Sequence, residues 1–162
     1  MIRIHHRLIG LIVFFSLPSV VQAACQYMNA LEFAKAAWQQ GDALLDNVKW
    51  LNSNASKPLN QLLAKERQCA KSEVCAIDAS IWTGGQDGEA YSPISYQQTN
   101  KVGSAAVKIR YRFGFGVADA QKTNRTSIVH AVQQASGCWQ LTDIVDRDGN
   151  SLVRRLEGYY GK

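Results

Sequence analysis

The sequence predicts an α+β fold in which N-terminal helices pack on one face of an antiparallel sheet of three to four strands. The first observation is a change of period: apolar residues recur at helical spacing from Tyr27 to Cys69 and alternate after Pro93. The second is that hairpin-sized linkers join the alternating segments, which makes neighbouring strands antiparallel. Helices followed by such a meander are typical of an α+β domain.

Helical spacing covers two long segments and one short one. The first segment is 27–51, and Gly41 is expected to bend or split it. The second begins near Pro58, because proline fits best in the first turn of a helix, and continues to Cys69. A short closing helix is expected over 151–156.

Alternation of apolar and polar residues predicts strands over 94–102, 106–117, 126–134 and 138–145. The clearest strand places six apolar residues on one face: Val107, Ile109, Tyr111, Phe113, Phe115 and Val117. We expect this face to lie beneath the helices, with both phenylalanines in the core.

The stretch 112–119 (RFGFGVAD) resembles two binding motifs but satisfies neither. A dinucleotide-binding loop needs a third glycine and a following helix, whereas here Asp119 stands in that place and no helical pattern follows. The RNA-reading motif needs aromatics on an open sheet face, whereas Phe113 and Phe115 continue the apolar stripe.

The first 23 residues have the order of a secretory signal peptide: a basic start, an apolar run over 8–15 and a cleavage site at Ala23. Cleavage there leaves 24–162 as a single domain in the periplasm or outside the cell. Cys25 lies close enough for lipidation, but the lipoprotein signal normally has Leu where this chain has Gln22.

The charge balance of the mature chain is mild. Removing the signal segment takes two of the 18 basic residues and none of the 13 acidic ones, which gives 16 − 13 = +3. A dedicated nucleic-acid binder usually carries a dominant basic patch, so we expect no nucleic-acid partner.

Four cysteines remain in the mature chain, and an exported protein should pair them as two disulfides. Three connectivities are possible. The short spacing of Cys69 and Cys75 favours a local Cys69–Cys75 bridge, which leaves Cys25–Cys138. Zinc is the less favoured interpretation, because there is no CxxC pair and only one histidine follows the signal segment. We therefore expect no metal.

Two groups of residues are candidates for contacts with a partner. The first lies in the polar, glycine-containing stretch 80–93, and the second is the polar face of the clearest strand. The candidates are Trp82, Gln86, Asp87 and Tyr91 in the stretch, and Lys108, Arg110 and Arg112 on the strand. The three cations are either a solvated face neutralised by cross-strand carboxylates or a contact surface for an acidic partner.

Catalytic signals are weak. His130 is the single histidine after the signal segment and is placed mid-strand, and no cysteine has a recognisable histidine-based constellation beside it. Asp146, Asp148 and Asn150 have calcium-loop spacing, but Ser151 stands where the loop requires glycine, so a turn is the simpler interpretation. We expect no catalytic residue and no cofactor.

The second half of the chain resembles the bacterial domain of unknown function numbered 3828, a family of the nuclear-transport-factor-2-like superfamily. The features that carry the resemblance are Asp78-x-x-x-Trp82, Gln86-Asp87, the alternating strand, Cys138-Trp139-Gln140-Leu141-x-Asp143-Ile144 and Ser151-Leu152-x-x-x-Leu156. The resemblance implies a cone-shaped fold, with helices in the concavity of a curved sheet. It implies little chemistry, because members of the superfamily include enzymes, ligand binders and protein-binding modules.

Some exported members of this family resemble immunity proteins that neutralise peptidoglycan-amidase toxins of type VI secretion. The first hypothesis is therefore a non-enzymatic periplasmic protein-binding module, in the form of an immunity protein against a cell-wall hydrolase. No toxin-binding loop matches residue by residue, so no site is carried over. The alternative is a small-ligand pocket inside the cone, lined by Tyr111, Phe113 and Trp139.

Overall fold

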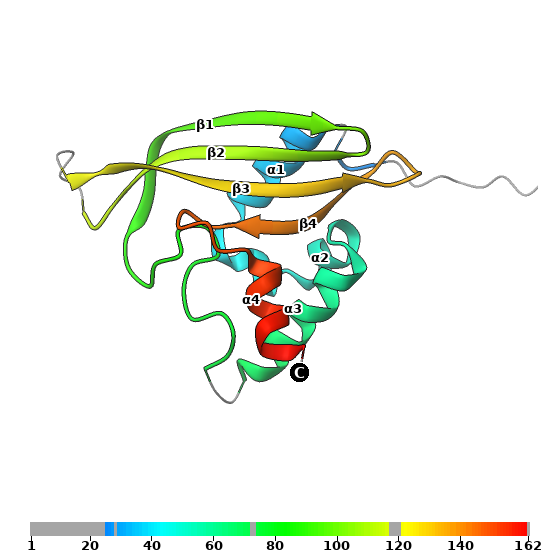
Figure 1. Cartoon of the computed structure of the whole chain (residues 1–162), viewed down its shortest axis with the longest axis horizontal. Helices are drawn as coiled ribbons and strands as arrows, with labels where there is room; N and C mark the ends of the chain where they lie inside the picture. Colours follow the sequence, from blue (N-terminus) through cyan, green and yellow to red (C-terminus); the bar gives the residue numbers. More distant parts are fainter. Residues whose placement is uncertain (1–24, 28, 72–73, 117–120, 162) are drawn as a thin grey trace, which may run out of the picture.

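The structure is a computed structural model that describes residues 25–27, 29–71, 74–116 and 121–161. It is an α+β domain: a helical layer packs against one face of an open, four-stranded antiparallel sheet (Figure 1). The expected signal segment and its cleavage at Ala23 lie outside the described residues, as does Val117.

The predicted helix over 27–51 is divided into three. The observed elements are α1 (Ala30–Gln39), the 3-10 helix η1 (Gly41–Asp46) and α2 (Val48–Asn54). Gly41 adopts a φ of +57°, a left-handed conformation that ends the first helix. Asn29 and Asn47 cap α1 and α2, since their side chains accept hydrogen bonds from the amides of Glu32 and Trp50.

The other two helices follow the predicted segments. Helix α3 (Lys57–Cys69) has proline in its first turn and ends at the predicted cysteine. Helix α4 (Leu152–Tyr160) begins where predicted but extends beyond residue 156, and the Ser151 side chain caps it by accepting from the Arg154 amide.

The strands are β1 (Glu89–Lys101), β2 (Ser104–Gly114), β3 (Thr123–Gln133) and β4 (Trp139–Val145), paired in the order β1-β2-β3-β4. Strand β1 begins at Glu89 rather than at residue 94. Sequence reasoning began this strand after Pro93, but a register shift between Tyr91 and Ser95 accommodates the proline on an edge strand.

The prediction that Phe115 is a core residue is wrong. Strand β2 ends at Gly114, so the alternation stops there, and the Phe115 side chain is 74% exposed. Phe113, still inside the strand, is buried, and the two rings meet edge to face with centroids 5.4 Å apart. The alternating pattern continued in the sequence after the strand had ended.

The core lies between the helices and the inner face of the sheet. Alternate residues are buried there, from Ala105 to Phe113 on β2 and from Ser127 to Ala131 on β3, whereas those between them are exposed or half-buried. Its largest fully buried side chains are Phe33, Leu44, Leu51, Leu59, Leu63, Val107, Ile109, Tyr111, Val129, Leu141, Ile144 and Leu156.

Two disulfides close the described chain, with the pairing that the spacing favours. Cys25–Cys138 ties the segment before α1 to the start of β4, and Cys69–Cys75 closes the loop after α3. Disulfides are typical of proteins that fold in oxidising compartments. In the described part of the chain, no helix is long and apolar enough to cross a membrane.

The two disulfides should contribute unequally to stability. They span 113 and 6 residues, and a bridge that closes a longer loop removes more entropy from the unfolded chain. We expect Cys25→Ser/Cys138→Ser to lower the free energy of unfolding by about 5 kcal/mol and Cys69→Ser/Cys75→Ser by about 2 kcal/mol. Urea denaturation of both variants measures the difference, and equal losses would contradict the prediction.

Candidate functional site

The outer face of the sheet carries the three predicted cations. Because side chains alternate along β2, Lys108, Arg110 and Arg112 lie on the face opposite the buried Tyr111. Lys108 and Arg110 are exposed, and Arg112 is half-buried. Successive cations on such a face are about 7 Å apart.

No carboxylate lies directly across from these cations in the described strands. In the two neighbouring strands the paired residues are Gln97 and Ile128 for Lys108, Ser95 and Thr126 for Arg110, and Tyr91 and Asn124 for Arg112. Arg110 Nη2 donates to Gln97 Oε1 at 2.9 Å, a neutral partner. The first of the two interpretations, neutralisation by cross-strand carboxylates, is therefore not observed at the paired positions of the described strands.

Tyr91 belongs to the same surface. It is paired with Arg112, so both side chains lie on the outer face. Lys122 Nζ lies 4.0 Å from the centroid of the Tyr91 ring, which is cation–π geometry. We call the surface formed by Tyr91, Lys108, Arg110, Arg112 and Lys122 the cationic face.

The other predicted contact residues do not join it. Trp82 is only 3% exposed, so its side chain packs in the core rather than on the outer surface of the loop. It packs edge-on against Trp38, with ring centroids 5.0 Å apart. Gln86 and Asp87 are exposed on the loop before β1. Sequence reasoning included Trp82 among the contact residues because it lies in a polar stretch, but the turn that contains it folds back onto the sheet.

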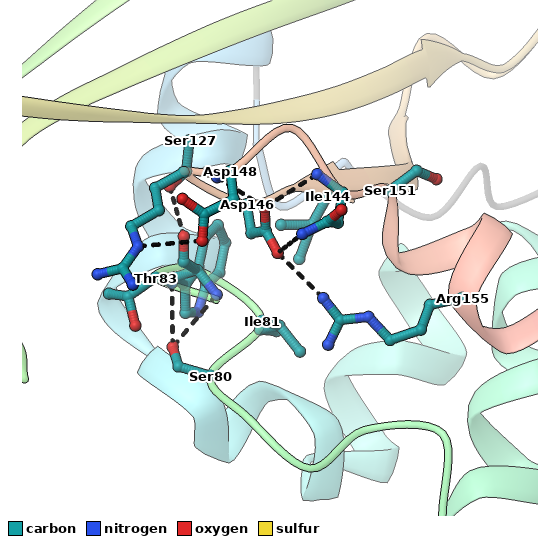
Figure 2. Close-up of polar contacts among 12 residues, drawn as sticks. Ser80, Ile81, Thr83, Ser127, Ile144, Asp146, Asp148, Ser151 and Arg155 are labelled. Atoms are coloured by element: carbon teal, nitrogen blue, oxygen red, sulfur yellow. Dashed lines mark hydrogen bonds and ion pairs between the residues drawn. The ribbon is translucent and has the colours of Figure 1, made fainter. Parts of the chain in front are cut away.

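Buried hydroxyl groups hold this turn against the sheet (Figure 2). The carbonyl oxygen of Trp82 accepts from Ser127 Oγ at 2.6 Å. Tyr111 Oη lies 3.2 Å from the same oxygen. Burial raises the pKa of the Tyr111 hydroxyl, which keeps it protonated as a donor. Ser80 Oγ accepts from the amides of Trp82 and Thr83, which closes the turn.

A second turn packs beside the first. Asp146 is buried, and its carboxylate accepts from the amides of Asp148 and Asn150, from Asn150 Nδ2 and from Arg155 Nη2 (Figure 2). A Cβ atom on Gly84 would lie 2.8 Å from Asp146 Oδ2, so only glycine lets the two turns meet this closely. The residues with calcium-loop spacing thus form a turn whose central carboxylate already binds protein donors.

The three residues of the alternative ligand pocket do not converge on one cavity. The Tyr111 hydroxyl is occupied by Ser127 and by the Trp82 carbonyl, and Trp139 lines neither cavity found among the described residues. Phe113 lines a small cavity of about 240 Å³, where the Arg147 guanidinium lies 4.0 Å from its ring centroid. This proposed lining set is therefore not supported, because the region around Tyr111 is filled.

A much larger cleft of about 1440 Å³ lies elsewhere, between the ends of α1 and α3, η1, the loop before β1 and the start of β1. It is lined by five carboxylates and two basic residues: Asp42, Asp46, Glu66, Asp78, Glu89, Arg67 and Lys71. We call it the acidic cleft. Of the predicted contact residues that remain exposed, Gln86 lines it.

Sequence reasoning missed this cleft, although one signal was present. The stretch 76–93 contains three acidic residues and no basic one, whereas 101–116 contains four basic residues and no acidic one. Such segregation of charge by segment predicts surfaces of opposite sign more directly than the net charge does.

Glu66 fixes one wall of the acidic cleft. Its side chain is buried and accepts from the amides of Ala76 and Ile77 and, at 2.7 Å, from Tyr160 Oη. These bonds join α3, the segment after the Cys69–Cys75 loop, and the end of α4. Burial and the hydrogen bond and negative charge of Glu66 raise the pKa of Tyr160 to about 12.

The remaining candidates for catalysis or metal binding are His130 and any group of metal-ligating side chains. His130 is half-buried on β3, paired with Ala106 and Asp143. In the described ranges, no three His, Cys, Asp or Glu residues are grouped so as to hold a metal ion.

Comparison of the chain with protein-family models, curated proteins and solved structures gives no significant match. Function is therefore inferred from the geometry of the described residues.

The Tyr160 hydroxyl should make stability depend on alkaline pH. Its pKa is raised from 10.0 to about 12, so the folded chain keeps a proton that the unfolded chain loses. The resulting stability is complete below pH 10 and is lost as the pH rises towards about 12. Urea denaturation across this range should show a shallower fall in stability for Tyr160→Phe than for wild type. Tyr159→Phe is the matched control, and we expect it to keep the wild-type slope.

The Ser127 hydroxyl should be needed to hold the Trp82 turn. Ser127→Ala leaves the buried Trp82 carbonyl with a poorer set of donors, and we expect a loss of about 1–3 kcal/mol in the free energy of unfolding. Thr126→Ala, on the opposite face of the same strand, should change it by less than about 0.5 kcal/mol. Denaturation followed by tryptophan fluorescence measures both. Similar losses for the two variants would contradict this role.

Proposed function

We propose that this chain is a non-enzymatic, exported protein-binding module whose cationic face contacts an acidic surface of a partner protein. The observation that carries the proposal is a sheet face that no helix of the described residues covers, on which Lys108, Arg110 and Arg112 share one strand. The exposed cations Lys108 and Arg110 have only neutral residues directly across from them.

A sheet face suits this role for physical reasons. The backbone pairing of β2 with both neighbours fixes the spacing of the cations, so little backbone conformational entropy is lost on binding. Tyrosine and arginine are enriched in protein interfaces, and this face contains Tyr91, Arg110 and Arg112. A row of like charges also accelerates encounter with a surface of opposite sign.

A binding role is further supported by the structural hydrogen bonds of the two buried carboxylates. Glu66 and Asp146 both accept several hydrogen bonds from protein donors, which gives each a structural task. The proposal therefore assigns no catalytic residue and needs no cofactor.

Compartment and family are part of the proposal. The two disulfides fit folding in the periplasm or outside the cell. The order of helices and antiparallel strands is compatible with a nuclear-transport-factor-2-like cone and with family 3828. On that resemblance, the specific form we propose is an immunity protein that inhibits a peptidoglycan-amidase toxin of type VI secretion.

Charge reversal on the cationic face should weaken partner binding. We expect the mature chain to retain a peptidoglycan-hydrolysing protein from periplasmic extract and to inhibit its digestion of purified peptidoglycan. Lys108→Glu/Arg110→Glu should weaken binding by at least about tenfold at low salt, with a smaller difference near 0.5 M salt, because exposed charges are then screened. Titration of the purified partner by calorimetry measures the affinities.

The matched control is Lys49→Glu/Lys57→Glu, which makes the same charge change at exposed positions on the helices. We expect it to bind as wild type does, and unfolding midpoints should show that both variants are folded. Equal binding by the two variants would show that the cationic face is not the partner-binding surface. A hydrolase that binds but stays fully active would contradict the immunity role alone.

A further inference from the structure

We propose that the acidic cleft is a second binding site, which accepts a polypeptide segment carrying Lys or Arg side chains beside apolar ones. It lies between the helices and the sheet, and its lining residues include none of the cationic face. The inference does not depend on the proposed function.

The charges that line the acidic cleft favour a cationic ligand. Three of its carboxylates, Asp46, Asp78 and Glu89, have no hydrogen bond or ion pair with described residues, and all three are exposed. They come from η1, the loop and β1, so negative charge is distributed around the cleft.

The basic residues of the cleft have other partners. Arg67 Nη1 donates to the Leu45 carbonyl at 3.0 Å, and Lys71 Nζ donates to Gln68 Oε1 at 3.3 Å. With five carboxylates against two cations, the lining has a formal charge of 2 − 5 = −3. A ligand that carries several positive charges complements such a lining best.

The cleft also presents aromatic and aliphatic surface. Trp38, Trp82 and Tyr96 line it together with Ile77 and Ile94. Aromatic faces attract ammonium and guanidinium groups, and the aliphatic stems of Lys and Arg pack on apolar surface. The Tyr96 ring already has one such contact, since Lys35 Nζ lies 5.5 Å from its centroid.

Two buried polar groups in the lining have no partner. Trp82 Nε1 and Thr83 Oγ1 make no hydrogen bond with any described residue, and the two residues are 3% and 5% exposed. Leaving such a group unsatisfied costs about 1–3 kcal/mol, so these groups themselves favour a polar ligand at this place. The indole N–H suits a peptide carbonyl, and the threonine hydroxyl suits either a carbonyl or an amide.

Size and position favour a polypeptide over a free amine. A volume of about 1440 Å³ exceeds the range of roughly 300–1,000 Å³ typical of small-molecule pockets. Four residues of β1 line the cleft: Glu89, Ala90, Ile94 and Tyr96. Strand β1 is an edge of the described sheet, so it offers unpaired backbone groups to an extended chain.

The test uses the peptide acetyl-Gly-Lys-Leu-Lys-Leu-Gly-amide, titrated into the mature chain by calorimetry and by tryptophan fluorescence. We expect saturable binding that changes the fluorescence, because Trp38 and Trp82 line the cleft. Asp78→Asn/Glu89→Gln should weaken it by about tenfold or more, since two unpartnered charges are lost. Glu32→Gln/Glu157→Gln removes the same charge from exposed sites outside the cleft and should change affinity by less than about twofold.

Two comparisons distinguish binding in the acidic cleft from binding at the cationic face and from simple attraction between opposite charges. The variant Lys108→Glu/Arg110→Glu should bind the peptide as wild type does, so failure of the proposed function leaves this result unaffected. The peptide should bind more tightly than spermidine, which carries more positive charge than the peptide but neither the backbone nor the apolar side chains. The proposal is overturned by an absence of saturable binding, by equal effects of the two carboxylate variants, or by equal affinity for spermidine.

Discussion

The carbonyl oxygen of Trp82 is the point on which the architecture of the described chain depends. It is buried, and the hydroxyls of Ser127 and Tyr111 hold it against the inner face of the sheet. Because this bond network fixes a loop rather than a helix or strand, no regular backbone pairing could replace it. The anchored turn places Trp82 beneath one end of α1 and directs the following residues towards β1. The anchored Trp82 turn therefore positions both one wall of the acidic cleft and the start of the edge strand.

The two faces of the sheet are unlike. Its inner face is covered by helices and the Trp82 turn, whereas its outer face carries the cations of β2, with neutral residues directly across from Lys108 and Arg110. The acidic cleft opens elsewhere, so charges of opposite sign are separated in space. A mature net charge of 16 − 13 = +3 hides this separation, because it sums a basic surface and an acidic one. Charge distribution is therefore the more informative property for finding partners.

How far the sequence predicts this structure depends on the range of the interactions. Alternation along β2 is local, so it correctly places Lys108, Arg110 and Arg112 on one face. The exposure of Phe115 and the burial of Trp82 depend on where a strand ends and where a loop folds back, which are tertiary events. The acidic cleft combines Asp46, Asp78 and Glu89 from three separate elements, so no local period predicts it. The signal in the sequence was the segregation of acidic and basic residues along the chain, which predicts an acidic surface separate from the basic one.

The edge strand β1 connects the two proposed binding surfaces. On one side Tyr91 pairs with Arg112 in the cationic face, and on the other Ala90 and Tyr96 line the acidic cleft. A single flat acidic surface of a partner cannot bind both, because it would be attracted to the cationic face and repelled by the acidic cleft. A partner that occupies both must present an acidic surface to the sheet and pass a basic segment around β1 into the cleft. Occupation of both surfaces by one partner would thus require opposite charges on two of its parts, a more selective demand than either surface makes alone.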